Sequence, residues 1–440
     1  MDAEALARSV IVRLRQAGHQ AYLVGGCVRD RLRGVKPKDF DISTDARPDR
    51  IMDLFPNSGR VGAHFGVVLV RDVFAQVEVA TFRSDFDYGD GRRPATVHFE
   101  SDPKADVLRR DFTINGLMMD PDTGRVLDYV DGRADLDRRL IRAIGDPDER
   151  FREDHLRLLR AVRFAARLRF TIEPGTLAAI ERHHALVLRV SAERIRDELV
   201  RILTEGGARY GFELLDATGL LGAILPEVAA MHGVAQPPEF HPEGDVWVHT
   251  LGLLERLDHP TPPLALAALL HDVGKPPTFR VADRIRFDGH AEAGVELAHD
   301  ILSRLRFSRE DMERVEALVA NHMRFMDVSR MKDSTLKRFL RLPGFDEHLE
   351  LHRLDCMAGS GYLENYQRVK QALAEIPNEE LRPEPLITGR DLIAAGYRPG
   401  PLFSRILEAV EEAQLDGRLK SAGEAMAWVR ARWPADMDAM

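Results

Sequence analysis

Two aspartates separated by one residue are the first feature of this sequence whose types and spacing could do chemistry. Asp39 and Asp41 lie in DFDIST (39–44), whose β-branched and apolar content predicts a strand. Residues i and i+2 of a strand point to the same side, so both carboxylates would face one spot. Two such oxygen ligands suit Mg²⁺, which takes its other ligands from water and substrate phosphates. Glu78, in a second strand-like segment, is a candidate third carboxylate, with a Glu paired at a sheet edge as the alternative.

A glycine pair lies upstream of these aspartates. Gly25 and Gly26 end a buried strand-like segment, AYLVGG (21–26), and precede a helical stretch. Glycines let the backbone approach a triphosphate closely, and the start of the next helix offers free N–H groups. Arg29, one turn into that helix, could pair with phosphate oxygens in a bidentate manner. The alternative is a tight turn that binds nothing. The spacing does not match GxGxxG, so it gives no support to a dinucleotide-binding fold.

The segment EDHLR (153–157) has side chains suited to choosing a base. On a helix, Asp154, Arg157 and Arg160 fall at i, i+3 and i+6 on one ridge, with Arg163 further around. Cytosine and adenine both present an exocyclic amine beside a ring-nitrogen acceptor, which a carboxylate beside a guanidinium complements. Uracil and guanine present a carbonyl beside an N–H and would oppose both groups. The pair would therefore admit CTP and ATP and reject UTP and GTP. The alternative is an arginine-rich helix held by ordinary salt bridges.

A separate set of histidines and aspartates, all potential metal ligands, appears in the second half of the chain. Its members are His249, His271, Asp272, His290, His322 and Asp355. His271 and Asp272 are adjacent, at the end of an apolar helical stretch, LALAALLHDVGKP (264–276). Imidazole and carboxylate together suit Mn²⁺, Co²⁺, Ni²⁺ or Zn²⁺ better than Mg²⁺ alone. His290 and His322 either complete a dinuclear site or are ordinary buried histidines.

The elements that must position these residues change in character along the chain. Apolar periodicity predicts a helix over 2–17, and alternation predicts further strands over 66–72 and 75–82. Beyond about residue 150 the helical period dominates to the C-terminus. Proline-rich segments such as 235–245 mark further boundaries. The predicted parts are an α/β domain (1–145), a helical region (146–235), a helical domain that carries the histidines (236–365) and a helical tail (366–440).

The composition excludes several classes of protein. Of 440 residues, 44% are hydrophobic and 30% are charged, which excludes a disordered or fibrous chain. The net charge of −9 provides no global basic field for nucleic acid, so a polyanion site must be a local patch. Residues 150–201 hold such an excess, with twelve arginines against seven acids. Two cysteines and the lack of a long apolar run indicate a reducing compartment and no membrane span, so we expect a cytoplasmic protein.

Four blocks of the sequence occur in an order that is jointly very specific. They are GGCVRD (25–30), KDFDISTDA (38–46), RRDFTINGLMMD (109–120) and EDHLRLLRAVRFAARL (153–168). In this order they resemble the bacterial-type (class II) CCA tRNA nucleotidyltransferase and poly(A) polymerase family. The resemblance implies a polymerase-β-like α/β nucleotidyltransferase head (1–145), followed by a helical neck and RNA-binding region (146–235) and an all-α body. It also implies that Asp39 and Asp41 hold two Mg²⁺ ions that activate the RNA 3′-hydroxyl for attack on the α-phosphate.

The same resemblance implies further site residues. The EDxxR block would act as the template for the incoming base. A long polar loop at 83–99 resembles one that is needed for adding the final adenosine, which disfavours an enzyme that adds only C. Asp111 would be a motif partner of the triphosphate site. The residues expected to hold the nucleotide are Gly25, Gly26, Arg29, Arg110, Asp111, Asp154, Arg157, Arg160 and Arg163.

The context of His271 and Asp272, an apolar helix followed by Gly-Lys, resembles the HD metal-dependent phosphohydrolase superfamily. The resemblance implies that His249, His271, Asp272 and Asp355 ligate a divalent metal such as Ni²⁺, Co²⁺ or Mn²⁺ within residues 236–365. A phosphatase or phosphodiesterase activity, on 2′,3′-cyclic phosphates or damaged tRNA ends, would follow. This activity would be separate from a head that runs on Mg²⁺.

The interpretation that unites these features is an enzyme that adds CMP, CMP and AMP to the tRNA 3′ end from CTP and ATP, binding the 3′ end and acceptor stem. An A-adding tRNA nucleotidyltransferase or a poly(A) polymerase shares the same motifs and stays open. Two interpretations from other classes are an HD phosphohydrolase that acts on RNA ends and a non-catalytic RNA-binding protein. The presence of Asp39, Asp41, Arg110 and Asp154 disfavours both, because a site that has lost its activity has no need for unpaired acids. The oligomeric state stays open.

Overall fold

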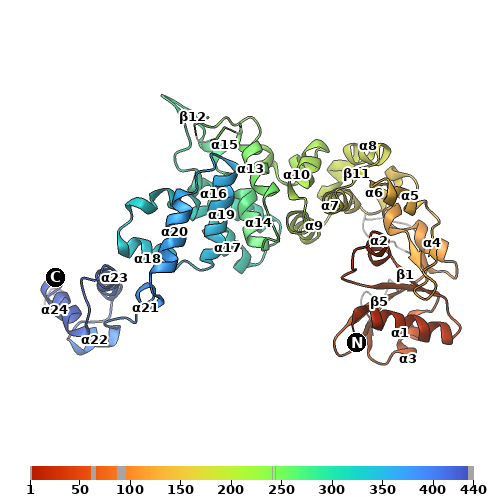
Figure 1. Ribbon diagram of the computed structural model, residues 1–440, viewed down its shortest axis with the longest axis horizontal. Coiled ribbons are helices and arrows are strands. Elements are labelled where there is room, and N and C mark those ends of the chain that lie inside the picture. Colours follow the sequence, from red (N-terminus) through yellow and green to blue (C-terminus); the bar gives the residue numbers. More distant parts are fainter. Residues whose placement is uncertain (1, 61–65, 87–95, 240, 243, 435–440) are drawn as a thin grey trace. The chain divides into compact units, whose positions relative to one another are not determined.

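A mixed seven-stranded β-sheet forms the centre of the head. The computed structural model describes residues 2–60, 66–86, 96–239, 241–242 and 244–434. The strand order is β3-β4-β5-β2-β1-β8-β9; β2 and β5 are parallel, and the other neighbours are antiparallel (Figure 1). The strands are β1 (Ala21–Val24), β2 (Asp41–Thr44), β3 (Ser58–Arg60), β4 (Val67–Arg71), β5 (Gln76–Thr81), β8 (Met118–Met119) and β9 (Val126–Leu127). The predicted α/β head is confirmed.

Helix α1 (Ala3–Gln16) packs on this sheet through its apolar stripe. Asp2 caps its N-terminus with its side chain, and Gly18, at φ +87°, follows its C-terminal end. Ile11 of the helix and Ile42 of β2 are fully buried in one core. Burial of this stripe, more than intrinsic propensity, stabilises the helix. The other helical segments of the head are α2 (Gly26–Leu32), α3 (Pro48–Leu54), α4 (Pro103–Leu108), the 3₁₀ turn η2 (Thr113–Asn115) and α5 (Gly132–Asp137).

The polar segment at 83–99 begins and ends as a β-hairpin. Strand β6 (Arg83–Phe86) pairs antiparallel with β7 (Thr96–Phe99). Residues 87–95 lie outside the described residues, so the loop expected to serve adenosine addition is described only at its two ends.

Helices follow the head, with small two-stranded additions. Residues 140–141 and 171–172 form the parallel pair β10 and β11, which the helical prediction beyond residue 150 did not include. The helical segments of this neck are α6 (Pro147–Glu153), α7 (Arg157–Leu168), α8 (Pro174–His183), η3 (His184–Arg189), α9 (Ala192–Thr204), α10 (Ala208–Ala217), α11 (Leu220–Ile224) and α12 (Pro226–Ala229).

The prediction of one helical ridge through Asp154, Arg157 and Arg160 is wrong. Asp154 has extended dihedrals, φ −136° and ψ 103°, between the end of α6 and the start of α7. Its carboxylate accepts a hydrogen bond from the backbone N–H of Leu156 at 3.1 Å. Short acidic side chains compete in this way with backbone carbonyls for backbone N–H groups. Asp154 therefore lies between the two helices, after the end of α6 and before the start of α7.

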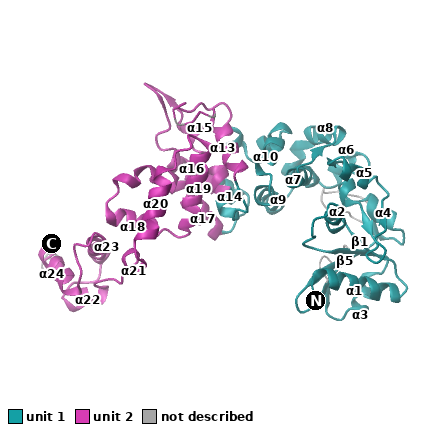
Figure 2. Ribbon diagram, in the orientation of Figure 1, with its two compact units in different colours: residues 1–230, 257–265, 300–308 teal, residues 231–256, 266–299, 309–440 magenta. Residues whose placement is uncertain are grey.

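The chain divides into two compact units (Figure 2). The first consists of residues 1–230, 257–265 and 300–308, and the second of residues 231–256, 266–299 and 309–440. The elements of the later chain are α13 (Val246–Glu255), α14 (Pro262–Leu270), α15 (Lys275–Thr278), β12 (Arg280–Val281), β13 (Ile285–Arg286), α16 (His290–Arg304), α17 (Arg309–Asn321), η4 (His322–Arg330), α18 (Asp333–Leu340), α19 (Phe345–Ala358), α20 (Glu364–Glu375) and α21 (Asn378–Leu381).

The C-terminal helices have an apolar core of their own. Buried Leu392, Ile406, Val410 and Val429 pack together there. These residues come from α22 (Gly389–Ala394), α23 (Pro401–Leu415) and α24 (Ala422–Arg432). Among the described residues, none of the helices combines the length and apolar character that a membrane crossing requires.

Candidate functional sites

Three carboxylates gather where β2 and β5 run side by side. Asp41 and Glu78 are register partners of these parallel strands. Asp39 precedes β2, so the strand predicted over 39–44 is wrong for its first two residues. The predicted alternation is nevertheless present, because Phe40 and Ile42 are buried on the side opposite the two aspartates. The pKa of Asp41 is raised to about 6, chiefly by burial and further by the negative charges of Glu78 and Asp39, although the positive charge of Arg110 opposes this rise. The positive charge of Arg110 therefore does not offset the negative charge of the three carboxylates. Such a group of oxygen ligands fits a hard divalent cation.

The glycine turn beside this acidic cluster requires glycine. Gly25 has φ +74° and ψ −132°, a combination that side chains with a Cβ avoid, and it precedes α2 directly. A Cβ placed there would lie 3.6 Å from Nη1 of Arg110, so that guanidinium lies against the turn. Arg29, in contrast, is buried and donates to Asn115 at 2.8 Å and Asp30 at 2.9 Å. Arg29 therefore supports the turn from within.

Arg110 is held by two residues that the sequence analysis did not single out. Its Nη2 lies 2.8 Å from Oδ2 of Asp106 and 3.1 Å from Oγ of Ser43, while its buried Nε has no hydrogen-bond partner among the described residues. Burial alone would raise the pKa of Asp106, but the guanidinium groups of Arg110 and Arg109 lower it to about 2. The i, i+3 and i, i+4 spacing of these charges on a helix was the available signal.

Asp111 joins the RRDF block to α7. Its Oδ2 accepts from Nε and Nη2 of Arg160 at 2.9 and 2.6 Å, and its Oδ1 accepts from the backbone N–H of Phe112 and the amide of Asn115. Burial would raise the pKa of Asp111, but Arg160 and the amide donor lower it to about 2. Asp111 and Arg160, both predicted to serve the nucleotide, are thus bound to each other.

Replacing Asp111 with asparagine should destabilise the head by about 2–3 kcal/mol at pH 7, because the buried Arg160 charge loses its counter-charge. A pKa held below its unfolded value contributes stability that is present above pH about 4 and is lost as pH falls toward about 2. Hydrogen exchange of peptides from the head, corrected for intrinsic rates, measures this difference at each pH. Asp137→Asn, at an exposed acid of α5, is the control. Equal protection of parent and D111N at pH 7 would show that the pair contributes nothing.

The two predicted base-reading residues bind different partners. The carboxylate of Asp154 accepts from Nη2 of Arg194 at 3.0 and 3.2 Å. Arg157 donates to Glu153 at 2.8 Å and to the backbone carbonyl of Arg109 at 2.8 Å. Arg194 of α9 was not anticipated as a site residue, because its partner lies 40 positions earlier in the chain and no local spacing relates them.

Three guanidinium groups surround Phe164 of α7. Arg29, Arg160 and Arg163 lie 5.5, 5.3 and 4.4 Å from the ring centroid. Arg163 also ion-pairs with Glu198 at 2.7 Å, and burial lowers its pKa to about 10. Cation–π contacts in a desolvated setting stabilise this arrangement. In this structure the guanidinium of Arg163 therefore binds groups in the interior of the neck.

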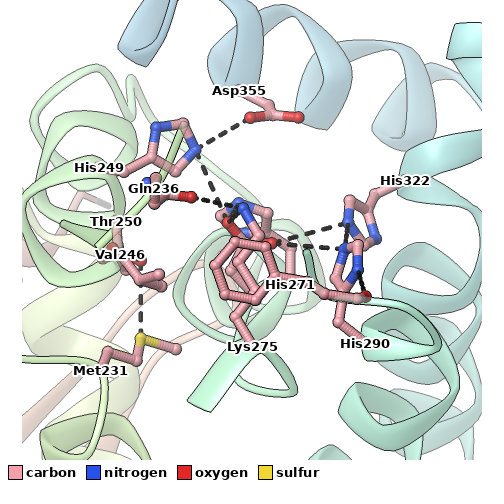
Figure 3. A network of polar contacts seen from close by, with 12 residues as sticks. Met231, Gln236, Val246, His249, Thr250, His271, Lys275, His290, His322 and Asp355 are labelled. Atoms are coloured by element: carbon pink, nitrogen blue, oxygen red, sulfur yellow. Dashed lines mark hydrogen bonds and ion pairs between the residues drawn. The ribbon is translucent and has the colours of Figure 1, made fainter. Parts of the chain in front are cut away.

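The second unit brings the predicted metal ligands together. Nε2 of His249, on α13, lies 3.0 Å from Oδ1 of Asp355, on α19, and 4.0 Å from Oδ2 of Asp272. Nε2 of His271 lies 3.2 Å from Oδ2 of Asp272. His249, His271 and Asp355 could share one metal ion, because their ligand atoms all lie within 4.8 Å of one another. Figure 3 shows these side chains converging.

A buried lysine accompanies this cluster. Nζ of Lys275 lies 2.7 Å from Oδ2 of Asp272 and 2.6 Å from Oε1 of Gln236. Burial would raise the pKa of Asp272, but His271 and Lys275 hold it well below its usual range. Gln236 is a further residue that the sequence analysis missed, and no local pattern marks it.

His290 and His322 lie on the other side of Asp272. Their Nε2 atoms are 3.2 Å apart, and each is 3.8 Å from Oδ1 of Asp272. Burial lowers the pKa of His322 to about 4, so it is neutral at neutral pH. A cavity of about 400 Å³ opens onto these residues, and its wall includes Arg284, Arg286, Phe287, Met323 and Met326.

Comparison with known proteins places these features in families. A family model described as "Poly A polymerase head domain" matches residues 21–142, one described as "Probable RNA and SrmB- binding site of polymerase A" matches 169–231, and an HD domain model matches 246–354.

Individual relatives extend the match along the chain. A CCA-adding enzyme of Levilactobacillus brevis is 47% identical over 215 residues, 49% of this chain and 54% of that protein, so this match spans about half of the relative's length. A CCA-adding enzyme of Limosilactobacillus reuteri is 31% identical over 419 residues, which cover 94% of this chain and 93% of that protein. The crystal structure of the Bacillus stearothermophilus CCA-adding enzyme in complex with CTP is similar with a TM-score of 0.74 and 26% identity, over 97% of both chains.

Proposed function

This chain belongs to the CCA-adding enzyme family, and from this premise we propose that it adds CMP, CMP and AMP to the tRNA 3′ end, using CTP and ATP and no nucleic-acid template. The observation that carries the proposal is the acidic cluster of Asp39, Asp41 and Glu78 beside the Gly25 turn. The match to an enzyme structure with bound CTP supports it. The partners are then the tRNA 3′ end with its acceptor stem, and the cytoplasm is the compartment that fits.

In the head, the acids and the glycine turn divide the work. Asp39, Asp41 and Glu78 would hold Mg²⁺, which supplies charge neutralisation at the phosphates and activation of the attacking hydroxyl. The backbone at Gly25 and Gly26 leaves room for a triphosphate, and Arg110, placed by Asp106 against that turn, offers it positive charge. Arg29 acts by holding the turn through Asn115.

Base choice falls to Asp154 and Arg157. A carboxylate has about four lone-pair directions and a guanidinium five N–H donors, so both keep capacity beyond their present partners. The carboxylate would accept from the exocyclic amine of cytosine or adenine, and the guanidinium would donate to the neighbouring ring nitrogen. Arg194, bound to Asp154, would fix the direction of that carboxylate.

Extension of a tRNA that lacks its last three nucleotides tests this function. With Mg²⁺, CTP and ATP together, the RNA should grow by three residues and stop. An A-adding enzyme would leave this RNA unchanged, and a poly(A) polymerase would add a long tail of A. Either outcome would overturn the proposal in favour of the corresponding alternative.

We further propose that the second unit hydrolyses phosphoesters with a divalent transition metal. Buried His249, His271 and Asp272, together with Asp355, form a donor set of imidazoles and carboxylates that fits Mn²⁺, Co²⁺ or Ni²⁺. Such a metal polarises a phosphoryl oxygen and lowers the pKa of bound water. Arg284 and Arg286, in the wall of the adjoining cavity, bring positive charge to the place where a phosphate would enter.

Replacing His271 and Asp272 together with alanine should remove hydrolysis of p-nitrophenyl phosphate and of 2′,3′-cyclic AMP, because half of the ligand set is lost. Nucleotide addition should stay unchanged, since the acidic cluster lies in the other unit. The control is His299→Ala, at an exposed histidine of α16 that pairs with Glu316. A parent protein that retains no metal and hydrolyses neither substrate with any of these ions would refute the activity.

A further inference from the structure

A single buried carboxylate binds two neighbouring arginines in the head. Asp106 of α4 is fully buried. Its Oδ1 accepts from Nε and Nη2 of Arg109 at 2.9 and 2.5 Å, and its Oδ2 accepts from Nη2 of Arg110 at 2.8 Å. Oγ of Ser43, on β2, donates to the same Oδ2 at 3.2 Å and accepts from Arg110 at 3.1 Å. Each oxygen of Asp106 therefore orients a different arginine.

The two arginines lead to different parts of the proposed nucleotide site. Nη1 of Arg110 lies against the Gly25 turn, and 19% of its side chain is exposed, so this guanidinium can reach a triphosphate. The backbone carbonyl of Arg109 accepts instead from Nη2 of Arg157, the arginine proposed to read the base, at 2.8 Å. Arg110 thus leads to the phosphates, and Arg109 leads to the base.

The contact with Arg157 has a physical reason at the end of α4. Arg109 is the C-cap of this helix, and the last carbonyls of a helix have no hydrogen-bond donor within it. Arg150 of α6 donates to the preceding carbonyl, that of Leu108, at 3.3 Å. Two consecutive carbonyls of α4 therefore hold two arginines of the segment that reads the base. A displacement of this helix end would move Arg110 and Arg157 together, and small displacements of binding groups slow a reaction strongly.

We propose that Asp106 is a positioning residue that couples triphosphate binding to base choice. One of its oxygens orients Arg110 toward the triphosphate, and the other holds Arg109, whose carbonyl supports Arg157. This inference rests on the proposed nucleotide addition. A guanidinium only donates, so both arginines require acceptors. An amide at this place would keep one acceptor oxygen and present an N–H group to the other arginine, whereas a carboxylate holds both at once.

Steady-state extension of one tRNA with CTP and with UTP tests this coupling. Asp106→Asn should raise KM for CTP about ten-fold with a smaller change in kcat, because a charged hydrogen bond that serves binding is weakened. The preference for CTP over UTP, as a ratio of kcat/KM values, should fall about ten-fold in the same variant. Two further variants should separate these effects: Ser43→Ala should raise KM alone, and Arg109→Ala should reduce the preference alone.

A second comparison shows whether Asp106 acts through Arg157. In a chain that carries Arg157→Ala, adding Asp106→Asn should leave the preference for CTP where it was while still raising KM for CTP. The matched control is Asp102→Ala, which removes the N-terminal cap of the same helix, a hydrogen bond from the backbone N–H of Lys104. This variant loosens the opposite end of α4 and should keep both the KM and the preference of the parent.

Each other outcome has a definite meaning. Asp106→Asn with the KM and preference of the parent would overturn the proposal. Asp102→Ala with the losses expected of Asp106→Asn would also overturn it, because general loosening of the helix would then be the cause. A further fall of preference in the Arg157→Ala chain would show that Asp106 does not act through Arg157, and the coupling would fail.

The proposal can be decided even if Asp106→Asn does not fold. Ser43→Ala and Arg109→Ala then decide it, and it fails unless each of them shows its own partial effect. A parent protein that extends the RNA without preferring CTP over UTP would instead refute the proposed function on which this inference rests.

Discussion

Replacing Asp41 with asparagine should reduce incorporation of both CMP and AMP about a thousand-fold or more, equivalent to about 4 kcal/mol in the transition state. The amide cannot serve as an anionic ligand, and Asp41 is less exposed than Asp39 and Glu78, the other two acids of the cluster. Asp39→Asn should act in the same way. Single-turnover extension of tRNA at saturating nucleotide measures the effect, and filter binding should show nearly unchanged affinity for tRNA.

Loss of folding can be separated from loss of chemistry in this variant. The pKa of Asp41 is raised from about 4 to about 6, so ionisation of this carboxyl destabilises the folded head, an effect that grows above pH about 4 and is complete above pH about 6. Asp41→Asn should therefore leave the head as stable as the parent, or more stable, at pH 8 without divalent ions. The control is Asp53→Asn at an exposed acid of α3, which should extend tRNA normally. Full incorporation by D39N or D41N would remove these residues from the catalytic role.

Replacing Asp154 or Arg157 with alanine should relax base choice as well as slow extension. A site built to hydrogen-bond one base edge rejects the wrong edge because buried polar groups are left unpaired, at about 1–3 kcal/mol each. Discrimination against UTP and GTP should thus fall by about ten-fold to a hundred-fold, measured as the ratio of kcat/KM values for each nucleotide on one tRNA.

Two further variants distinguish reading of the base from support of the reader. Arg194→Ala removes the partner of Asp154 and should slow extension while keeping the preference for CTP and ATP. Arg152→Ala, at an exposed residue of α6, should change neither property. If D154A and R157A exclude UTP and GTP as strictly as the parent does, the protein template hypothesis fails.

The sequence predicts the acidic cluster well because its signal is local. Alternation along 39–44 separates Phe40 and Ile42 from the two aspartates, and the buried pattern of β5 places Glu78 on the exposed side. The prediction that Glu78 joins them needed the pairing of β2 with β5, which no local pattern specifies.

The ridge of Asp154, Arg157 and Arg160 failed for a physical reason that could be recognised in advance. An aspartate favours helix ends, where its side chain competes for backbone N–H groups, and Asp154 does so at Leu156. Asp154 instead binds Arg194, 40 positions away in the chain, and Arg160 binds Asp111, 49 positions away. Only tertiary packing brings such pairs together.

The histidine cluster is an intermediate case. Its ligand types and the His271-Asp272 dipeptide were visible in the sequence, but His249 and Asp355, 106 positions apart, meet only because α13 packs on α19. Spacing alone did not reveal whether His290 and His322 join this cluster, and the structure places each of their Nε2 atoms 3.8 Å from Oδ1 of Asp272.

The measurement that tests the account most directly is stepwise extension of three tRNAs, ending before C74, at C74 and at C75, with each nucleoside triphosphate supplied singly and the products sequenced. One site with a protein template predicts CMP addition to the first two RNAs from CTP alone, AMP addition to the third from ATP alone, and no extension from UTP or GTP. All of these steps should vanish together in D41N. Addition of AMP that persists in D41N, or extension by UTP at a rate close to that of CTP, would contradict the account.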